Sequence, residues 1–340
     1  MKIFYNISPG FYKNLLCSAV NKRVPVLVVY TTEYDASSRN KDFMQGERDF
    51  PHIQLTGSKW EQIWDTIKIL RREKYSEIIT GGYESVYDWT VAFLSPRKKN
   101  AVMVESTIRE TKKTGIRAFL KKIFFKRMSK AYVCGTPHAE LVKYFGFNGE
   151  IVNMQGVGLF NTIAQPTVTQ RVSGGGYRFL FVGRLIPVKN LAWLIERFKE
   201  HPEHKLSIIG FGAEEENLRR ISNDVPNVEM LGAVNNKDLP SYYQNAEIFI
   251  LPSITETWGV VVEEALNNGI PVMASHMVGS ADDLIIAKDT GVVFKLNDTD
   301  DFEAKLAEIT DVENYNRMCR NISNIDFLAR EQEKVDCFIR

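Results

Sequence analysis

The chain has 340 residues, of which 44% are hydrophobic and 25% are charged, and its formal net charge is +1 at pH 7. This composition excludes an intrinsically disordered chain, and at this length two medium-sized hydrophobic cores are expected rather than one. The four cysteines are scattered without the spacing of a metal site or a disulfide framework, so we expect a reducing compartment such as the cytosol.

The charged residues are unevenly divided between the two halves of the chain. Residues 1–165 contain 25 Lys and Arg against 15 Asp and Glu, and the remaining residues contain 18 against 27. No stretch reaches the roughly 18 consecutive apolar residues of a membrane-spanning helix, and no long apolar signal core opens the chain. We therefore expect a cytoplasmic protein that is neither secreted nor inserted across a membrane.

The first half alternates between short apolar strands and helical segments, which indicates a parallel sheet covered by helices. The expected strands span residues 2–7, 26–31, 77–80, 100–105, 132–134 and 150–154. The turn Ser8-Pro9-Gly10 follows the first strand, which puts Gly10 at the carboxyl edge of the sheet. Glu105 and Ser106 follow a later strand at the same edge. Glu105 either binds hydroxyl groups there or compensates a helix start.

A predicted helix over residues 59–74 carries an apolar stripe at helical spacing. The stripe consists of Trp60, Ile63, Trp64, Ile67 and Leu70. We expect these side chains to face the core of the first domain. The polar residues 33–57 before this helix are expected to form a surface loop with one extended piece near His52.

The segment over residues 111–131 is the strongest charge signal in the sequence. Its basic residues are Lys112, Lys113, Arg117, Lys121, Lys122, Lys126, Arg127 and Lys130, and its apolar residues are Ile116, Phe119, Leu120, Ile123, Phe124 and Phe125. This pattern suits the surface of an anionic membrane, and it suits equally an ordinary amphipathic helix with a solvated basic face. A nucleic-acid partner is not expected, because the chain has no recognition motif and its other half is acidic.

Residues 166–176 have the Gly- and Thr-rich composition of a flexible linker. An expected strand over residues 178–182 follows, and after it come Gly183, Arg184 and Lys189. Open α/β sheets bind ligands at the carboxyl ends of their strands, and two cations there can neutralise a diphosphate.

Residues 246–275 read as a strand, a polar loop, a helix and a second strand. Glu256 lies in the loop and Glu264 lies inside the helix, so the two acids bracket the helix start. Free backbone N–H groups at that start favour an anion, and Gly259 lets a ligand approach the backbone closely. The residues that offer these groups are Thr257, Trp258, Gly259 and Val260. Carboxylates beside an anion site suit a nucleotide sugar.

This stretch resembles the donor-site signature of the retaining glycosyltransferases of family 4, which have the GT-B fold. The signature has Glu, seven residues, Glu, and then Ala-x-x-x-Gly-x-Pro-Val. The residues in register with it are Glu256, Glu264, Ala265, Gly269, Pro271 and Val272. The chain departs from the family at Thr257-Trp258, where Gly-Phe is commonest, and at Glu105-Ser106, where many members carry a histidine.

The resemblance implies an α/β fold of the GT-B type, with two Rossmann-like doubly wound parallel-sheet domains facing across a cleft. The donor-binding residues that it implies are Gly183, Arg184, Lys189, Gly210, Phe211, Val234, Glu256, Thr257, Trp258, Gly259, Val260 and Glu264. Arg184, Lys189 and Glu256 are the implied catalytic residues. The acceptor-binding residues would be Gly10, Glu105 and Ser106, and no metal ligand is implied.

Four segments are expected from the resemblance and the composition together. They are an acceptor-binding domain over residues 1–165, a linker over 166–176, a donor-binding domain over 177–325, and a C-terminal helix over 326–340 that crosses back to the first domain.

The implied activity is metal-independent, retaining transfer of a hexosyl group, without a cofactor, from a nucleotide sugar to a glycan or lipid-linked acceptor in polysaccharide or glycoconjugate synthesis. A UDP-linked sugar is favoured, and the segment from Lys112 to Lys130 would hold the enzyme on the inner face of the membrane. The alternatives are a GT-B sugar-nucleotide epimerase or phosphorylase, and a non-catalytic nucleotide-sugar-binding protein.

Overall fold

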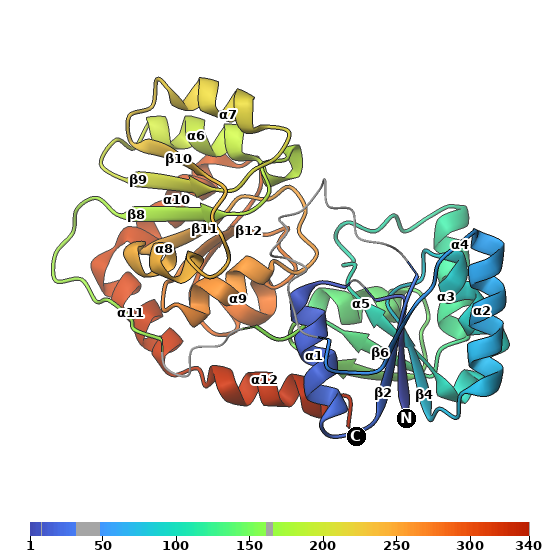
Figure 1. Ribbon diagram of the computed structural model, residues 1–340. Coiled ribbons are helices and arrows are strands. Elements are labelled where there is room, and N and C mark those ends of the chain that lie inside the picture. Colours follow the sequence, from blue (N-terminus) through green and yellow to red (C-terminus); the bar gives the residue numbers. More distant parts are fainter. Residues whose placement is uncertain (8, 32–47, 161–165, 340) are drawn as a thin grey trace. The chain divides into compact units, whose positions relative to one another are not determined.

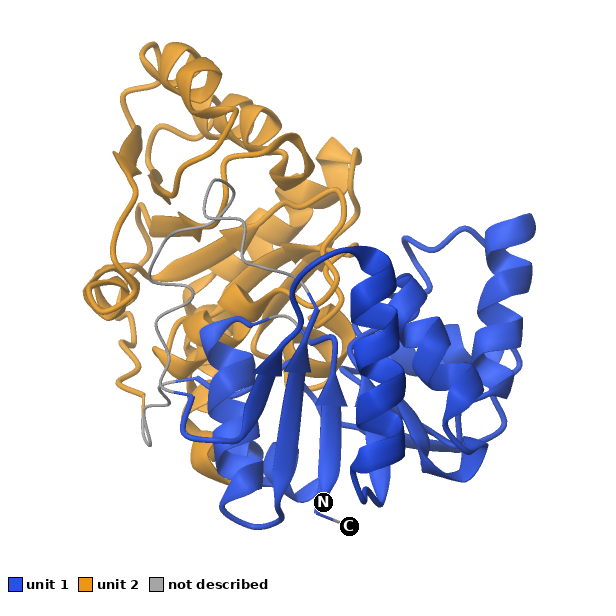
Figure 2. Ribbon diagram, turned by 45° about the vertical axis from the view of Figure 1, so that its right-hand side comes forward, with its two compact units in different colours: residues 1–160, 330–340 blue, residues 161–329 orange. Residues whose placement is uncertain are grey.

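The computed structural model describes residues 1–7, 9–31, 48–160 and 166–339 (Figure 1). Its chain forms two compact units (Figure 2). Unit 1 comprises Met1–Phe160 and Arg330–Arg340, and unit 2 comprises Asn161–Ala329. Ser8 and most of the stretch predicted as a polar surface loop lie outside the described residues.

Unit 1 contains a seven-stranded parallel sheet in the order β3-β2-β1-β4-β5-β6-β7. The strands are β1 (Lys2–Tyr5), β2 (Val26–Tyr30), β3 (His52–Gln54), β4 (Glu77–Thr80), β5 (Asn100–Val104), β6 (Lys130–Val133) and β7 (Glu150–Asn153). The central strands β1, β2 and β5 are buried along their whole length. Their continuous apolar sequences are therefore those of strands covered on both faces.

Helices α2 to α5 cover one face of this sheet (Figure 1). The helices of unit 1 are α1 (Phe11–Asn21), α2 (Lys59–Arg72), α3 (Val86–Leu94), α4 (Ile116–Lys126) and α5 (Thr136–Tyr144), with a short 3₁₀ turn at Arg97–Lys99. Helix α12 (Phe327–Asp336) begins in unit 2 and continues into unit 1. Ile69 of α2 and Val91 of α3 pack in one apolar cluster with Tyr5 of β1. Capping boxes start two of these helices, Ser58 with Glu61 in α2 and Ser85 with Asp88 in α3.

The C-terminal segment packs on the opposite face of the same sheet. The ring of Phe338 stacks on Tyr132 with centroids 4.5 Å apart and lies 5.3 Å from the ring of Phe4. Phe4 and Tyr132 alternate along their strands with residues that face α2 to α5, so they point the other way. The chain thus returns to unit 1 after completing unit 2.

Unit 2 contains a six-stranded parallel sheet in the order β10-β9-β8-β11-β12-β13. The strands are β8 (Arg178–Val182), β9 (Lys205–Ile209), β10 (Val228–Gly232), β11 (Ile248–Leu251), β12 (Val272–Ser275) and β13 (Gly291–Phe294). The helices are α6 (Leu191–Lys199), α7 (Glu215–Ser222), α8 (Leu239–Asn245), α9 (Val260–Asn267), α10 (Thr299–Thr310) and α11 (Val312–Ser323), with a 3₁₀ turn at Pro187–Lys189 and a π-helical turn at Ala281–Ile286. The prediction of two doubly wound parallel sheets is confirmed.

One packing prediction was wrong. The sequence led us to expect the whole apolar stripe of α2 in the core, but Trp60 and Trp64 are 74% and 61% exposed. The buried side of α2 is instead formed by Thr66 and Ile69, with Ile63 and Leu70 half-buried. The two tryptophans project from the outer side of the helix.

Candidate functional site

The loop after β8 places Lys189 at the carboxyl edge of the unit 2 sheet. Lys189 ends the 3₁₀ turn, and the next residue, Asn190, has a left-handed backbone with φ of 57°. The Lys189 side chain is largely buried, and its Nζ donates to the carboxylate of Glu256. A backbone hydrogen bond of 2.8 Å from the N–H of Ile254 to the carbonyl of Val188 joins the two loops. Two predicted site residues far apart in the sequence are therefore in contact.

The loop that carries Glu256 is held from behind by the segment after β12. The carbonyl of Glu256 accepts from the N–H of Gly279 at 2.9 Å, and the carbonyl of Trp258 accepts from the N–H of Ser280 at 3.0 Å. The indole of Trp258 is buried and donates to Glu263 at 2.7 Å. This side chain anchors the loop in the core, so a contribution of Trp258 to ligand binding would come from its backbone.

Gly259 begins helix α9 next to Glu256. Its φ is 87°, in the left-handed region that glycine adopts most easily, and it occupies the N-cap of α9. A Cβ at this position would lie 3.4 Å from the Cγ of Glu256 and 3.1 Å from Val278. The first N–H groups of α9, which have no partner within the helix, therefore start beside the Glu256 side chain. Thr257 is exposed and Val260 is half-buried.

Glu264 has a partner that the sequence did not reveal. The hydroxyl of Tyr243, a buried residue of α8, donates to Glu264 Oε2 at 3.0 Å. Burial raises the pKa of Glu264, and the neighbouring Glu263 adds to this, while the Tyr243 hydrogen bond acts in the opposite direction. Tyr243 thus fixes one oxygen of the second acid of the motif.

The glycines near β8 and β9 let two loops interlock. The N–H of Gly183 donates to Ile209 at 3.0 Å, and the N–H of Leu185 donates to Phe211 at 2.8 Å. Gly210 has a φ of 149°, and a Cβ on it would lie 1.8 Å from the carbonyl oxygen of Gly183. Close packing of the two backbones is therefore enough to explain why position 210 requires glycine.

The remaining predicted donor residues lie around these loops. Arg184 is exposed, directly after Gly183. Phe211 is half-buried beside Gly210, and Val234 is half-buried just beyond the end of β10. The contact between Lys189 and Glu256, with the start of α9 beside it, forms the centre of the candidate site.

The predicted acceptor residues lie at the carboxyl edge of the unit 1 sheet. Gly10 is the N-cap of α1, and its carbonyl accepts from the N–H of Lys13 at 3.0 Å. The ammonium of Lys13 lies 2.6 Å from a carboxylate oxygen of Glu105, and Ser106 follows it as a half-buried residue. The ion pair with Lys13 gives Glu105 a role beyond a helix-start charge.

Lys13 is a site residue that the sequence analysis missed. Burial alone would lower its pKa, but the charge of Glu105, with smaller effects of Tyr12 and Cys134, raises the pKa above its usual value. The side chain is therefore a buried cation. The sequence shows a lysine among the apolar residues of a predicted helix. Only the fold shows that α1 directs this side chain toward the end of β5.

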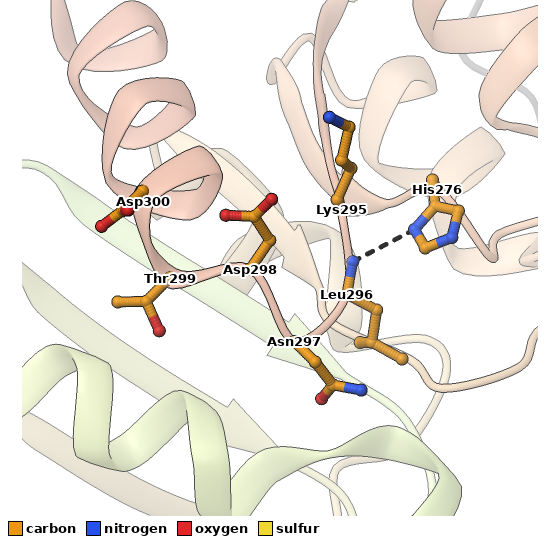
Figure 3. Close-up of a pocket in the computed structure, with 7 residues that line it drawn as sticks. All are labelled: His276, Lys295, Leu296, Asn297, Asp298, Thr299 and Asp300. Atoms are coloured by element: carbon orange, nitrogen blue, oxygen red, sulfur yellow. Dashed lines mark hydrogen bonds between the residues drawn. The ribbon is translucent and has the colours of Figure 1, made fainter.

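A separate polar pocket of about 630 Å³ lies at the ends of β12 and β13 (Figure 3). It is lined by His276, Lys295, Leu296, Asn297, Asp298, Thr299 and Asp300. His276 Nδ1 accepts from the N–H of Leu296 at 3.1 Å, and Asp298 caps α10 through the N–H of Asp301. Its lining contains none of the residues predicted for the donor site.

In the part of the chain that the structure describes, no three His, Cys, Asp or Glu side chains come together as a metal site. Over the same residues, no helix has both the length and the apolar character needed to cross a bilayer.

Known proteins resemble the second half of the chain in sequence. Residues 169–324 match the family described as glycosyl transferases group 1. Sulfoquinovosyl transferase SQD2 of Arabidopsis thaliana is 33% identical over 162 residues, which are 46% of this chain and 30% of that protein. The UDP-Gal:alpha-D-GlcNAc-diphosphoundecaprenol alpha-1,3-galactosyltransferase of Escherichia coli is 30% identical over 156 residues, which are 43% of this chain and 40% of that protein. The matches thus span well under half of these relatives' length.

The whole chain resembles solved structures in fold. HepE of Anabaena in complex with UDP superposes with a TM-score of 0.74 and 14% sequence identity, and the similarity covers 99% of both chains. The protein therefore has the GT-B fold. The match of residues 169–324 to the glycosyl transferases group 1 family agrees with this fold, and membership of family 4 stays a prediction.

Proposed function

We propose that the protein transfers a hexosyl group from a UDP-sugar to a glycan or lipid-linked acceptor, with retention of anomeric configuration and without a metal ion. The observation that carries this proposal is the contact of Lys189 with Glu256 beside the start of α9. It is supported by the name of the Escherichia coli relative, which specifies a UDP-sugar and a lipid-diphosphate acceptor, and by the complex of HepE with UDP.

The donor would exchange partners with the ion pair. In the structure, Lys189 and Glu256 form an ion pair and neutralise each other. A bound diphosphate would take the ammonium of Lys189, aided by Arg184 and the first N–H groups of α9, and would leave the Glu256 carboxylate to accept from hexose hydroxyls. Glu264, oriented by Tyr243, would accept from the ribose.

The reaction would follow a front-face path. The bond from the anomeric carbon to the diphosphate breaks, and the acceptor oxygen bonds to that carbon on the same face. A diphosphate oxygen takes the acceptor proton. Lys189, Arg184 and the N–H groups of residues 257–260 would stabilise the charge that develops on the leaving group. At the carboxyl edge of the unit 1 sheet, Glu105 would bind acceptor hydroxyls beside Gly10 and Ser106. Its ion pair with Lys13 would hold it in place.

Association with a membrane surface forms part of the proposal. Helix α4 carries four basic residues and no acidic residue, and Ile116, Phe119 and Leu120 are exposed on it. Such a helix suits an anionic bilayer, where a lipid-linked acceptor would be found.

The test is turnover of the Lys189→Ala variant. A thermal-shift screen of UDP, GDP and ADP first identifies the nucleotide, and release of that nucleotide from its sugars is then measured with and without acceptor. We expect Lys189→Ala to lose about 10²- to 10³-fold in turnover, since a preorganised cation facing the leaving group is removed. Lys295→Ala, which removes an exposed lysine at the same sheet edge, serves as the control and should retain full activity.

Near-wild-type turnover of Lys189→Ala would remove Lys189 from the mechanism. Conversion of the donor with no acceptor present would favour an epimerase. Nucleotide binding without any turnover would favour a non-catalytic nucleotide-sugar-binding protein.

A further inference from the structure

Exposed apolar side chains are concentrated on one helical layer of unit 1. Among the described residues, fourteen large hydrophobic side chains are exposed, and nine of them lie on α2 to α5. These nine are Trp60, Trp64, Val86, Phe93, Leu94, Ile116, Phe119, Leu120 and Tyr144. Single exposed apolar residues are common on soluble proteins, but a set gathered on adjoining helices marks an interaction surface.

The four helices form one continuous layer. Helices α2 and α3 share an apolar cluster through Ile69 and Val91, and Trp89 of α3 contacts Phe124 of α4 with ring centroids 5.5 Å apart. The guanidinium of Arg127 lies 5.3 Å from the ring of Phe93, which also ties the end of α4 to α3. Since the inner sides of these helices cover the sheet, the exposed side chains lie on the outer surface of the layer.

The two tryptophans of α2 are the clearest members of this surface. Trp60 and Trp64 are one turn apart and therefore on the same side of the helix, with the buried Thr66 and Ile69 on its inner side. Indole rings are favoured at the boundary between lipid and water, where the apolar ring leaves water and the N–H stays hydrated.

The charge of the layer indicates which partner covers it. Helix α4 presents Arg117, Lys122 and Lys126 to solvent beside Phe119 and Leu120, and it contains no acidic residue. The last turn of α2 is basic as well. Basic side chains interleaved with exposed apolar ones complement a surface that is anionic outside and apolar just beneath, which is the headgroup region of an anionic bilayer.

We propose that α2 to α5 form one docking surface for an anionic lipid bilayer, in which Trp60 and Trp64 are inserted as a second anchor beside α4. This docking surface extends the proposed function, which places α4 alone on the membrane. It rests on that function only because the lipid-linked acceptor gives the protein a reason to bind a membrane. Helices that connect parallel strands run back from the carboxyl edge of the sheet, so Trp60, Trp64 and Ile116, near their helix starts, lie toward the edge that holds Glu105. Docking would bring that edge close to the headgroups.

The experiment measures binding of the full chain to sucrose-loaded vesicles of phosphatidylcholine with about 30% phosphatidylglycerol, near the anionic content that attracts basic segments. Pure phosphatidylcholine vesicles are measured in parallel, with no nucleotide sugar and no acceptor. We expect the variant Trp60→Ala/Trp64→Ala to bind the anionic vesicles at least about tenfold more weakly than the wild type. The matched control, Val172→Ala/Ile286→Ala, removes two exposed apolar side chains of unit 2 and should bind like the wild type.

Two further readouts separate insertion from electrostatic attraction. Tryptophan emission of the wild type should shift to the blue on anionic vesicles, and this shift should be lost in Trp60→Ala/Trp64→Ala. Lys122→Glu/Lys126→Glu should weaken binding to the anionic vesicles but leave the weak binding to pure phosphatidylcholine unchanged.

The proposal would be overturned if Trp60→Ala/Trp64→Ala bound the anionic vesicles as strongly as the wild type does. It would also be overturned if the wild type did not bind vesicles. A wild-type dimer that dissociates on this double substitution would overturn the proposal too, because a second copy would then cover the surface. If Lys189→Ala loses turnover while the wild type ignores vesicles, the transferase assignment stands and the docking surface does not.

Discussion

At the scale of single residues, the contact between Lys189 and Glu256 joins the cation that we propose for the leaving group to the carboxylate that we propose for the sugar. The proposed mechanism gives these two side chains different ligands. Removing the Glu256 charge should therefore affect the hexose step more than nucleotide binding. The position of Gly259 next to Glu256 keeps this carboxylate beside the helix start that would hold the phosphates.

We predict that Glu256→Gln lowers turnover about 100-fold while the affinity for UDP changes by less than about threefold. The amide is the same size as the carboxylate but is a weaker acceptor for hexose hydroxyls, and it frees Lys189 for the diphosphate. Calorimetry with UDP and nucleotide release with the full donor give the two values. A loss of UDP affinity in proportion to turnover would show that Glu256 acts on the nucleotide instead.

Asp88 in unit 1 is a buried acid that should make stability depend on pH. Burial raises its pKa from 3.8 to about 7, although hydrogen bonds from Asn6 at 3.0 and 3.1 Å and from the backbone of Ser85 oppose this. The folded state therefore keeps a proton that the unfolded state has lost. The stability that Asp88 contributes is complete below pH 3.8 and is lost as the pH rises toward 7.

We predict that the free energy of unfolding of the wild type, relative to Asp88→Asn, falls by about 2.5 kcal/mol between pH 5 and 8. Asn cannot ionise, so the variant removes this titration whatever its own stability. Chemical denaturation at several pH values gives both curves. Curves that stay parallel over this range would mean that Asp88 is ionised in the folded protein.

The sequence revealed single site residues better than their partners. Glu256 and Glu264 follow from a motif with fixed spacing, Lys189 follows from its place after an expected strand, and the strand positions show which sheet edge holds them. The partners Tyr243 and Lys13 lie on other helices, and their directions depend on helix packing that no local pattern encodes. Asn6 and Asp88, 82 residues apart, are joined only by the order of the strands.

At the scale of elements, the interlocked loops after β8 and β9 depend on glycine. We predict that Gly210→Ala lowers the free energy of unfolding of unit 2 by about 3 kcal/mol or more, because a Cβ 1.8 Å from the Gly183 carbonyl oxygen forces the two backbones apart. Thermal unfolding of unit 2 measures this loss. Gly174→Ala is the control, since a Cβ there meets no atom within 4 Å. Equal stability of the two variants would contradict the close packing.

Helix α2 illustrates why periodicity predicts a helix but not what covers it. Its apolar stripe predicted a helix over residues 59–74, and the helix is found at Lys59–Arg72. The stripe identifies an apolar side of the helix, but the sequence does not show which neighbouring elements bury that side. In unit 1, Thr66 and Ile69 are buried against the sheet, and the side chains of Trp60 and Trp64 are exposed to solvent.

At the scale of the whole molecule, the two parallel sheets follow from strands and helices that alternate along the chain, whereas the order of the strands and the exact bounds of the units depend on packing. Composition marked a linker over residues 166–176. In the structure, unit 2 already begins at Asn161, and the last eleven residues return to unit 1. A C-terminal helix that crosses back was expected from the resemblance, and the packing of Phe338 beside two strands holds the returning segment on the sheet of unit 1.

This return gives a prediction that separates the two units. Phe338 is fully buried against Tyr132 and Phe4, so Phe338→Ala should destabilise unit 1 by about 3–5 kcal/mol through the cavity it leaves. Hydrogen exchange of the β1 and β6 amides should quicken, while the amides of β8 and β11 and the affinity for UDP stay unchanged. Glu333→Ala, an exposed position on α12, should alter none of these. Faster exchange in β8 and β11 as well would show that the two units unfold together, and that the last eleven residues stabilise the whole chain rather than unit 1.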